Sequence, residues 1–245
     1  MARLTRRELK EDRLQTAFEG YEAFAKEHYK EILTVVGIGL VLVGAVAGLK
    51  VYTGQIESAA NAKLGAALDS YNAYVGTPAP GLLGPGTQSF PTAEEKYKKA
   101  LDQFQAVTQV SGFEKLLPEL KAVRIARYHT GLCQAQLGDD AAAAKTLQEV
   151  AKDKDSAIAS LARFALAEEY VKTGKLSDAI KLYQDLADHP SSTVPRSTAL
   201  LALADAYRTS QPAQARLIYE RLEKEYSSDT ALAEALKQQI SSLPQ

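Results

Sequence analysis

Cysteine, histidine, tryptophan and methionine are scarce in this 245-residue sequence, and their scarcity excludes several kinds of site. The single cysteine excludes an internal disulfide and a zinc site built on cysteine ligands. Three histidines, far apart in the chain, leave little material for a catalytic or metal-binding cluster. No tryptophan and one methionine exclude a flexible, methionine-rich binding surface. We therefore expect no metal and no cofactor.

An excess of charge of either sign is also missing. Lys and Arg number 29 against 30 Asp and Glu, which gives a formal net charge of −1. A protein that binds nucleic acid through its phosphates usually carries a net basic surface, so we expect no nucleic-acid partner. The 46% of hydrophobic residues and 24% of charged residues are typical of a folded protein.

The residues that could carry chemistry do not form a catalytic set. His129 and Cys133 are four residues apart and could form a nucleophile pair, but nothing supplies a third group. A small residue such as Cys133 packs well in a helix, so we expect a structural role for both. Of the two acidic pairs, we expect Asp139-Asp140 to cap a helix and Glu168-Glu169 to lie on an exposed face. We predict that the chain is not an enzyme.

One long hydrophobic run is present near the N-terminus. Residues 32–49, ILTVVGIGLVLVGAVAGL, contain no charged side chain, and the run closes with Lys50. About 20 apolar residues span the hydrocarbon core of a bilayer. The run therefore predicts a transmembrane helix over residues 32–52. The alternative is a signal peptide cleaved after Ala45-Val46-Ala47, but the 31 residues before the run are far more than a short basic leader segment.

Basic residues around this run predict its orientation. Seven Lys or Arg residues precede it, whereas only Lys50 and Lys63 lie within twenty residues after it. The positive-inside rule then places residues 1–31 in the cytoplasm and the rest of the chain in the periplasm of a bacterial inner membrane. Residues 1–31 also carry helical apolar spacing, which predicts an amphipathic segment that lies on the membrane or simply leads into it.

Glycine recurs on one face of the predicted transmembrane helix. Gly37, Gly44 and Gly48 are separated by seven and four residues, and the last two form a GxxxG pair. Small residues at this spacing let two helix backbones approach closely. They predict a contact face for another helix, which could belong to a second copy of this chain in a homo-oligomer.

Beyond the membrane segment the sequence repeats with a period of 36 residues. Gly138 corresponds to Gly174, and alanine and large apolar positions follow at the same offset. Three sets of second-helix positions follow at this offset: Ala143, Leu147 and Val150; Ala179, Tyr183 and Leu186; Ala215, Tyr219 and Leu222. An earlier, looser copy of these positions is Ala100, Phe104 and Val107. Each unit reads as a helical hairpin, and neighbouring hairpins must stack to bury their apolar faces. Strand patterns are missing, so the predicted fold is all-α, a transmembrane helix followed by a helical solenoid over residues 53–241.

These units resemble the tetratricopeptide repeat. The resemblance rests on LAEEYVKTGKLSDAIKLYQDL, in which Leu166, Ala167, Tyr170, Gly174 and Ala179 occupy the small, aromatic and glycine positions of the pattern. In the preceding unit Thr130 and Gln134 depart from it, and the last unit lacks the turn glycine. By analogy with such domains, the first helices would line a peptide groove. The expected groove residues are Tyr128, Phe164, Glu168, Lys172, Asp205 and Arg208.

The segment at 76–91, GTPAPGLLGPGTQSFP, interrupts the first hairpin. Its four prolines and four glycines forbid a helix and predict an irregular loop. A loop of this length is either functional or merely tolerated at the edge of a solenoid.

The layout as a whole is similar to that of the ancillary SecYEG translocon subunit family, in which a short cytoplasmic N-terminus, one membrane helix and periplasmic repeats follow one another. The resemblance implies protein partners among translocon subunits, periplasmic chaperones or envelope proteins. The alternative is a structural scaffold for envelope assembly or cell division. A cytoplasmic signalling adaptor is a third reading, which applies if the orientation is inverted.

Overall fold

The computed structural model describes residues 28–77, 84, 88–109, 120–153 and 157–244. The chain divides into two compact units, Met1–Ile56 and Glu57–Gln245. Most of the predicted amphipathic segment 1–31 lies outside the described residues, as does most of the predicted loop at 76–91.

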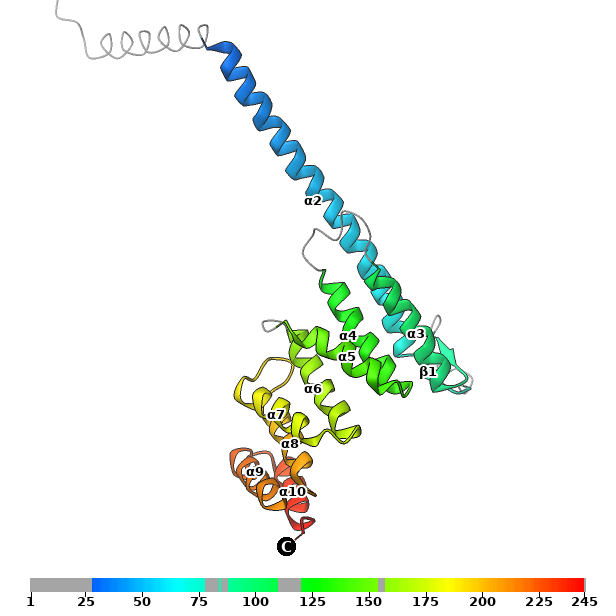
Figure 1. Cartoon of the computed structure of the whole chain (residues 1–245), viewed down its shortest axis with the longest axis vertical. Coiled ribbons are helices and arrows are strands. Elements are labelled where there is room, and N and C mark those ends of the chain that lie inside the picture. Colours follow the sequence, from blue (N-terminus) through cyan, green and yellow to red (C-terminus); the bar gives the residue numbers. More distant parts are fainter. Residues whose placement is uncertain (1–27, 78–83, 85–87, 110–119, 154–156, 245) are drawn as a thin grey trace, which may run out of the picture. The chain divides into compact units, whose positions relative to one another are not determined.

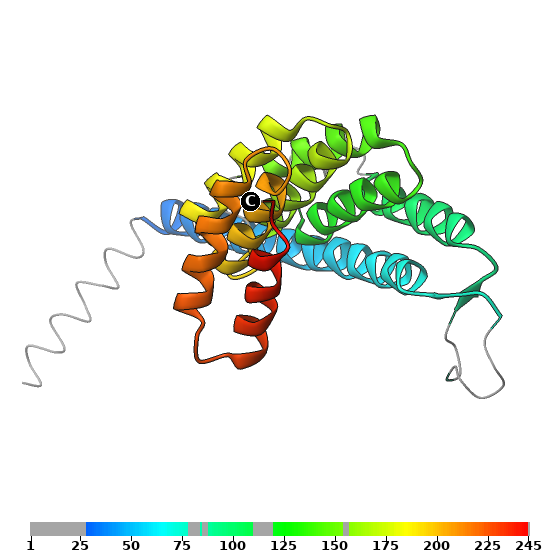
Figure 2. The same ribbon diagram turned by 90° about the horizontal axis from the view of Figure 1, so that it is seen from below.

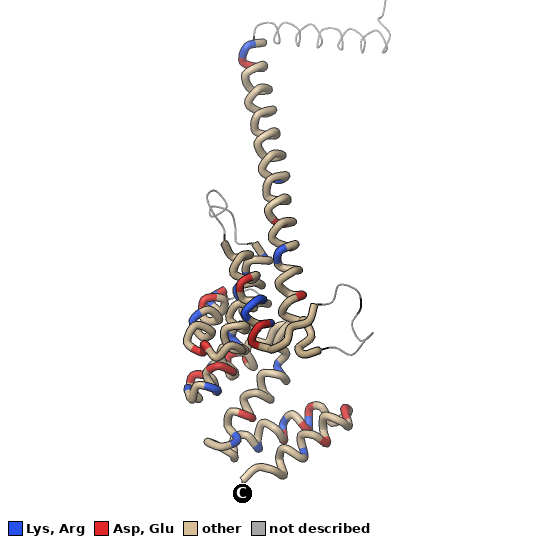
Figure 3. The backbone as a smooth tube through the Cα atoms, turned by 90° about the vertical axis from the view of Figure 1, so that its right-hand side faces the viewer, with Lys and Arg blue, Asp and Glu red and all other residues tan. Residues whose placement is uncertain are grey.

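Helix α2 (Tyr29–Tyr71) contains the predicted transmembrane segment and is much longer than that segment. Its 43 residues correspond to about 65 Å at about 1.5 Å per residue, twice the thickness of a bilayer core. Figure 3 shows the apolar part as an uninterrupted tan stretch between charged positions. In the described part of the chain, α2 is the one helix that is long and apolar enough to cross a membrane. Its last turns belong to the second unit.

The second unit continues with eight further helices in the described residues (Figure 1). They are α3 (Ala93–Thr108), α4 (Lys121–Gln136), α5 (Asp140–Ala151), α6 (Ala157–Lys172), α7 (Leu176–Asp188), α8 (Arg196–Tyr207), α9 (Pro212–Glu225) and α10 (Thr230–Ser241). Each of these helices packs against the next one in the chain, and α4 also packs against α6. Figure 2 shows the last two helices, α9 and α10, side by side. The predicted all-α solenoid is confirmed.

Local sequence determines where these helices begin and end. The Asp139 carboxylate accepts a hydrogen bond from the Ala142 amide at the start of α5, as the sequence predicted for this acidic pair. Pro212 occupies the first turn of α9, where its missing amide hydrogen costs nothing. Gly138 and Gly174 adopt φ of 81° and 76° in the turns before α5 and α7. Residues other than glycine rarely adopt this backbone conformation, so the two glycines fix the turns of their hairpins.

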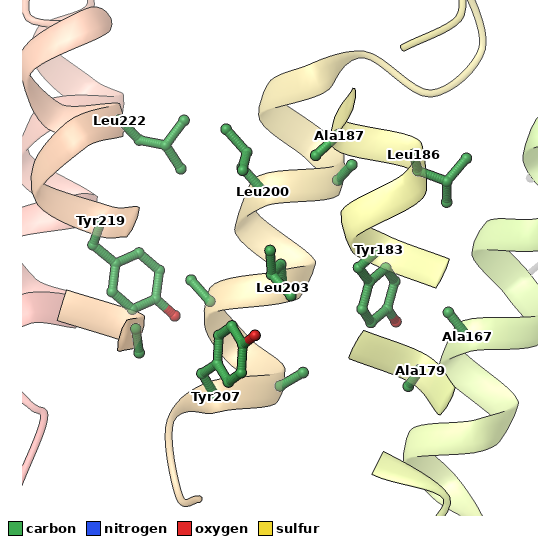
Figure 4. Close-up of a cluster of buried hydrophobic side chains, with 14 of the residues drawn as sticks. Ala167, Ala179, Tyr183, Leu186, Ala187, Leu200, Leu203, Tyr207, Tyr219 and Leu222 are labelled. Carbon is green, nitrogen blue, oxygen red and sulfur yellow. The ribbon is translucent and has the colours of Figure 1, made fainter. Parts of the chain in front are cut away.

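The core consists of the repeat positions that the period identified. Ala143, Ala179 and Ala215 are fully buried, and each precedes a large buried side chain by four residues. These large side chains are Leu147, Tyr183 and Tyr219. Figure 4 shows Tyr183 and Tyr219 among the leucines and alanines of the neighbouring helices. Alanine lets two helices approach, and the larger side chain one turn later fills the space between them.

A short strand pair interrupts the helical pattern, which the sequence analysis missed. Strands β1 (Tyr74–Val75) and β2 (Ser89–Phe90) pair in parallel at the two ends of the Pro/Gly segment. The Ser70 hydroxyl also donates a hydrogen bond of 2.9 Å to the Gln88 side chain. A strand of two residues is too short to show an alternating pattern, so the sequence does not predict this strand pair. The pair holds together the ends of the segment between α2 and α3.

Candidate protein-interaction surface

The six predicted groove residues lie on the first helices of successive hairpins. We call this set the first-helix surface. Tyr128 lies on α4, Phe164, Glu168 and Lys172 lie on α6, Asp205 lies on α8, and Arg208 is the residue that caps the C-terminus of α8. Since α4 packs against α6, Tyr128 and the α6 residues belong to one continuous region.

The two aromatic members are half-buried and contribute to the core as well as to the surface. The ring of Phe164 packs edge-on against Tyr183, with 5.5 Å between the ring centroids. Tyr128 packs against the cluster that contains Leu147 and Leu166. Burial raises the pKa of the Tyr128 hydroxyl, and the Glu168 charge adds to that rise. Both side chains therefore stay in fixed positions, each with one part against the core.

Lys172 is engaged within the domain. Its Nζ donates hydrogen bonds of 2.5 Å to Asp140 Oδ1 and 3.2 Å to the Ala135 carbonyl oxygen. These acceptors belong to the preceding hairpin, the carbonyl near the end of α4 and the carboxylate in the first turn of α5. The side chain of Lys172 is still 49% exposed, and its ammonium group joins two hairpins.

Asp205 and Arg208 are also engaged within the domain. The Tyr219 hydroxyl donates a 2.5 Å hydrogen bond to Asp205 Oδ1, which links α9 to α8. The Arg208 guanidinium donates to the side chains of Gln239 at 2.9 Å and Ser242 at 3.2 Å. Reversing the charge of Asp205 would break the first link.

The two glutamates of α6 differ sharply. Glu168 is exposed, as predicted, whereas Glu169 is only 8% exposed and its Oε2 has no hydrogen-bond partner among the described residues. The predicted exposed face is therefore wrong for Glu169, whose nearest cation is Lys172 Nζ at 4.0 Å. Burial raises the pKa of both carboxyl groups. The charge of Glu169 raises the pKa of Glu168 further. For Glu169, Lys172 lowers the pKa and Asp140 raises it.

His129 and Cys133 belong to the core of the first hairpins, as predicted. The imidazole of His129 stacks on Phe104 with 5.0 Å between ring centroids, and Tyr71 packs against it edge-on. Burial lowers the pKa of His129 to about 4 and raises that of the Cys133 thiol to about 12. A neutral imidazole and a protonated thiol suit packing better than nucleophilic chemistry.

Sequence reasoning missed the partners that tie the first-helix surface to other helices of the domain. Asp140 is 32 residues from Lys172, and Tyr219 is 14 residues from Asp205. The repeat alignment gives the helix pairing, but it does not specify which long side chains reach across each pair. For Lys172 and Asp140 the available signal was limited to the presence of opposite charges on nearby elements.

The predicted glycine face of α2 leaves space along the helix. An added Cβ at Gly37, Gly44 or Gly48 would meet no atom of the described residues within 4 Å. Side chains around them are exposed and apolar, such as Leu40 at 68% and Val46 at 67%. The three residues therefore provide room for another helix, and their role as a contact face stays a prediction.

Comparisons with known proteins agree with this architecture. A tetratricopeptide repeat model matches residues 164–230, and a second one matches residues 126–156. No curated protein sequence gives a significant match. The crystal structure of a putative kinesin light chain of Podosopora anserina, with nearly identical TPR-like repeats, superposes with a TM-score of 0.51. It is 15% identical, and the match covers 60% of this chain and 76% of that one.

An identity of this size shows the fold alone, whereas the two repeat models agree with the hairpins seen in the structure. Tetratricopeptide repeats are protein–protein interaction modules and typically non-catalytic scaffolds. Residues 126–156 and 164–230 of this chain are therefore similar to tetratricopeptide repeats.

Proposed function

We propose that the chain is a membrane-anchored protein-interaction module with its repeat domain in the periplasm. In this role it assists secretion or the handling of envelope proteins by binding translocon subunits or chaperones. The observation that carries the proposal is one helix, α2, which begins as an exposed apolar rod and ends inside a tetratricopeptide-repeat domain.

The apolar part of α2 supports the anchor. Leu33, Leu40, Val41 and Val43 are each more than 60% exposed, and no part of the apolar window is buried within the described residues. Exposed apolar surface costs about 25 cal/mol per Å² in water, a cost that a bilayer removes. The interior of a lipid bilayer is therefore the environment that suits these side chains.

The orientation rests on the basic residues before the apolar run. Seven Lys or Arg residues precede it, and the positive-inside rule retains such a segment in the cytoplasm. The repeat domain would then lie in the periplasm, where secreted chains emerge. The resemblance of the layout to the ancillary translocon subunits supports partners from the secretion machinery.

A scaffold for envelope assembly or cell division is the second candidate. It is favoured by the open space beside Gly37, Gly44 and Gly48, since helix association there would produce an oligomer. Replacement of Gly44 and Gly48 by isoleucine separates the two candidates. A scaffold built through this face would lose its oligomers, whereas an interaction module would keep its soluble-domain partners.

Membrane insertion is tested by fusing a reporter that is active only in the periplasm after Gln245. The proposal predicts an active reporter in the membrane fraction. Substituting arginine for both Leu40 and Val43 should release the protein, because each charge costs about 2.5–3.5 kcal/mol at the centre of a membrane helix. A stable but inactive fusion would overturn the orientation. A mature chain that begins near Gly48 would show a cleaved signal instead of an anchor.

The partner class is tested by crosslinking in living cells followed by affinity capture of the full chain. Translocon and chaperone subunits among the captured proteins support the proposed role. Division or cell-wall proteins would support the scaffold in its place. The same capture with the Leu40 and Val43 double arginine variant controls for partners that require the membrane.

A further inference from the structure

The charged members of the first-helix surface differ in how far the domain itself neutralises them. Lys172 is paired with Asp140, and Arg208 and Asp205 form an ion pair with 3.9 Å between Nη1 and Oδ1. Glu168 has no hydrogen-bond or ion-pair partner in the described part of the chain. It is therefore the one member of the first-helix surface whose charge the described residues leave uncompensated.

The surroundings of Glu168 are aromatic and apolar. Phe164 lies one turn before it on α6, and Val171 lies three residues after it with 42% of its surface exposed. Tyr128 of α4 and Tyr183 of α7 lie close enough for the Glu168 charge to affect both hydroxyl groups. A carboxylate in such surroundings has lost part of its hydration without gaining a partner.

A cationic side chain from a partner would supply the hydrogen bond and opposite charge that this carboxylate lacks. Hydrogen bonds between ammonium or guanidinium groups and a carboxylate are about twice as strong as neutral ones. The aliphatic stem of Lys or Arg would cover the aromatic side chains, and their faces attract a cation. An acidic partner would meet an uncompensated negative charge and would be repelled.

We propose that the first-helix surface binds a partner segment in which a Lys or Arg side chain pairs with Glu168, while apolar neighbours of that residue contact Phe164 and Tyr128. This inference rests on the proposed interaction function and specifies the chemistry of its partner. The occupant is a basic, apolar peptide segment. Binding of an acidic segment would be the opposite result, and the test distinguishes a basic occupant from an acidic one.

The test uses the full chain in detergent micelles and three fluorescent peptide pools, read by anisotropy. The pools share the same randomised apolar positions and differ at the central residue, which is Lys, Gln or Glu. We expect the Lys pool to bind about tenfold or more tightly than the Gln pool, since charged hydrogen bonds contribute about 1.5–3 kcal/mol. Glu168→Gln should abolish this difference, and added salt should weaken binding of the Lys pool.

Two variants make the result specific to the site. Glu220 is an exposed glutamate on α9, a second helix, and Glu220→Gln should leave all three pools unchanged. Glu168→Lys should transfer the preference to the Glu pool. Equal binding of the three pools, an unchanged preference in Glu168→Gln, or no binding of any pool overturns this inference. The proposed function fails separately, if crosslinking in cells captures no protein partner.

Discussion

The close approach of α4 and α5 at Gly131 gives a prediction that can be worked from the geometry. An added Cβ at Gly131 would lie 2.8 Å from both Cγ and Cδ2 of Leu147 and 3.5 Å from the Leu147 amide nitrogen. Leu147 is fully buried, so its side chain has no free space into which it could rotate. Gly131→Ala must therefore displace either Leu147 or the helix itself.

Two effects of opposite sign decide the result. Alanine is more favourable than glycine inside a helix by about 0.8–1.0 kcal/mol. Overpacking a filled core costs about 1–3 kcal/mol. Cγ is close to the backbone of Leu147 and cannot move aside as a side-chain end can, so we expect the second effect to dominate. The predicted net change is a loss of up to about 2 kcal/mol in the free energy of unfolding.

The chain contains a matched control in Gly65, which lies inside α2. An added Cβ there would meet no atom within 4 Å, so Gly65→Ala should stabilise by about 0.5–1 kcal/mol. The assay is urea unfolding of residues 57–245, followed by the helical circular-dichroism signal. Leu147→Ala as a background should remove the penalty of Gly131→Ala, which a double-mutant cycle measures. If both glycine substitutions stabilise equally, the reasoning about close approach is refuted.

Two further predictions concern the same fragment. Ala179 is fully buried, so Ala179→Leu should overpack the contacts of α7 and cost about 1–3 kcal/mol, and an unchanged melting temperature would mean that the hairpin register is wrong. His129 has its folded-state pKa lowered from 6.5 to about 4 by burial, so the unfolded state binds the proton more readily between these values. The free energy of unfolding should fall as pH drops from about 6.5 to about 4, by less than about 1.4 kcal/mol per pH unit because the ring keeps partial solvent access. His129→Phe should fit the aromatic stack and flatten this dependence, and identical pH profiles of the two proteins would contradict the assignment.

The repeat architecture could be predicted from the sequence because its determinants are local and periodic. The positive φ of Gly138 and Gly174 and the burial of Ala143 and Ala179 follow from a 36-residue period. Turn and close-contact positions tolerate only small residues, so they remain visible in a single sequence.

The details of the first-helix surface could not be predicted in the same way. The sequence does not indicate that Lys172 and Asp205 form bonds within the domain, because their partners, Asp140 and Tyr219, lie on other helices. Long side chains reach across a hairpin contact according to rotamer and spacing, which the repeat pattern does not encode. Glu169 was assigned to the exposed face with its neighbour, although adjacent residues of a helix point about 100° apart.

Contacts from the first-helix side of the repeat domain test the central claim most directly. A photo-crosslinking amino acid is placed, in the full chain in cell membranes, at the exposed residues Val171 on α6 and Thr198 on α8. The matched control is Lys181 on α7, a second helix, whose side chain is 74% exposed. The interaction module predicts protein adducts from Val171 and Thr198 and none from Lys181. Adducts from Lys181 alone, or equally from all three positions, would contradict binding on the first-helix surface.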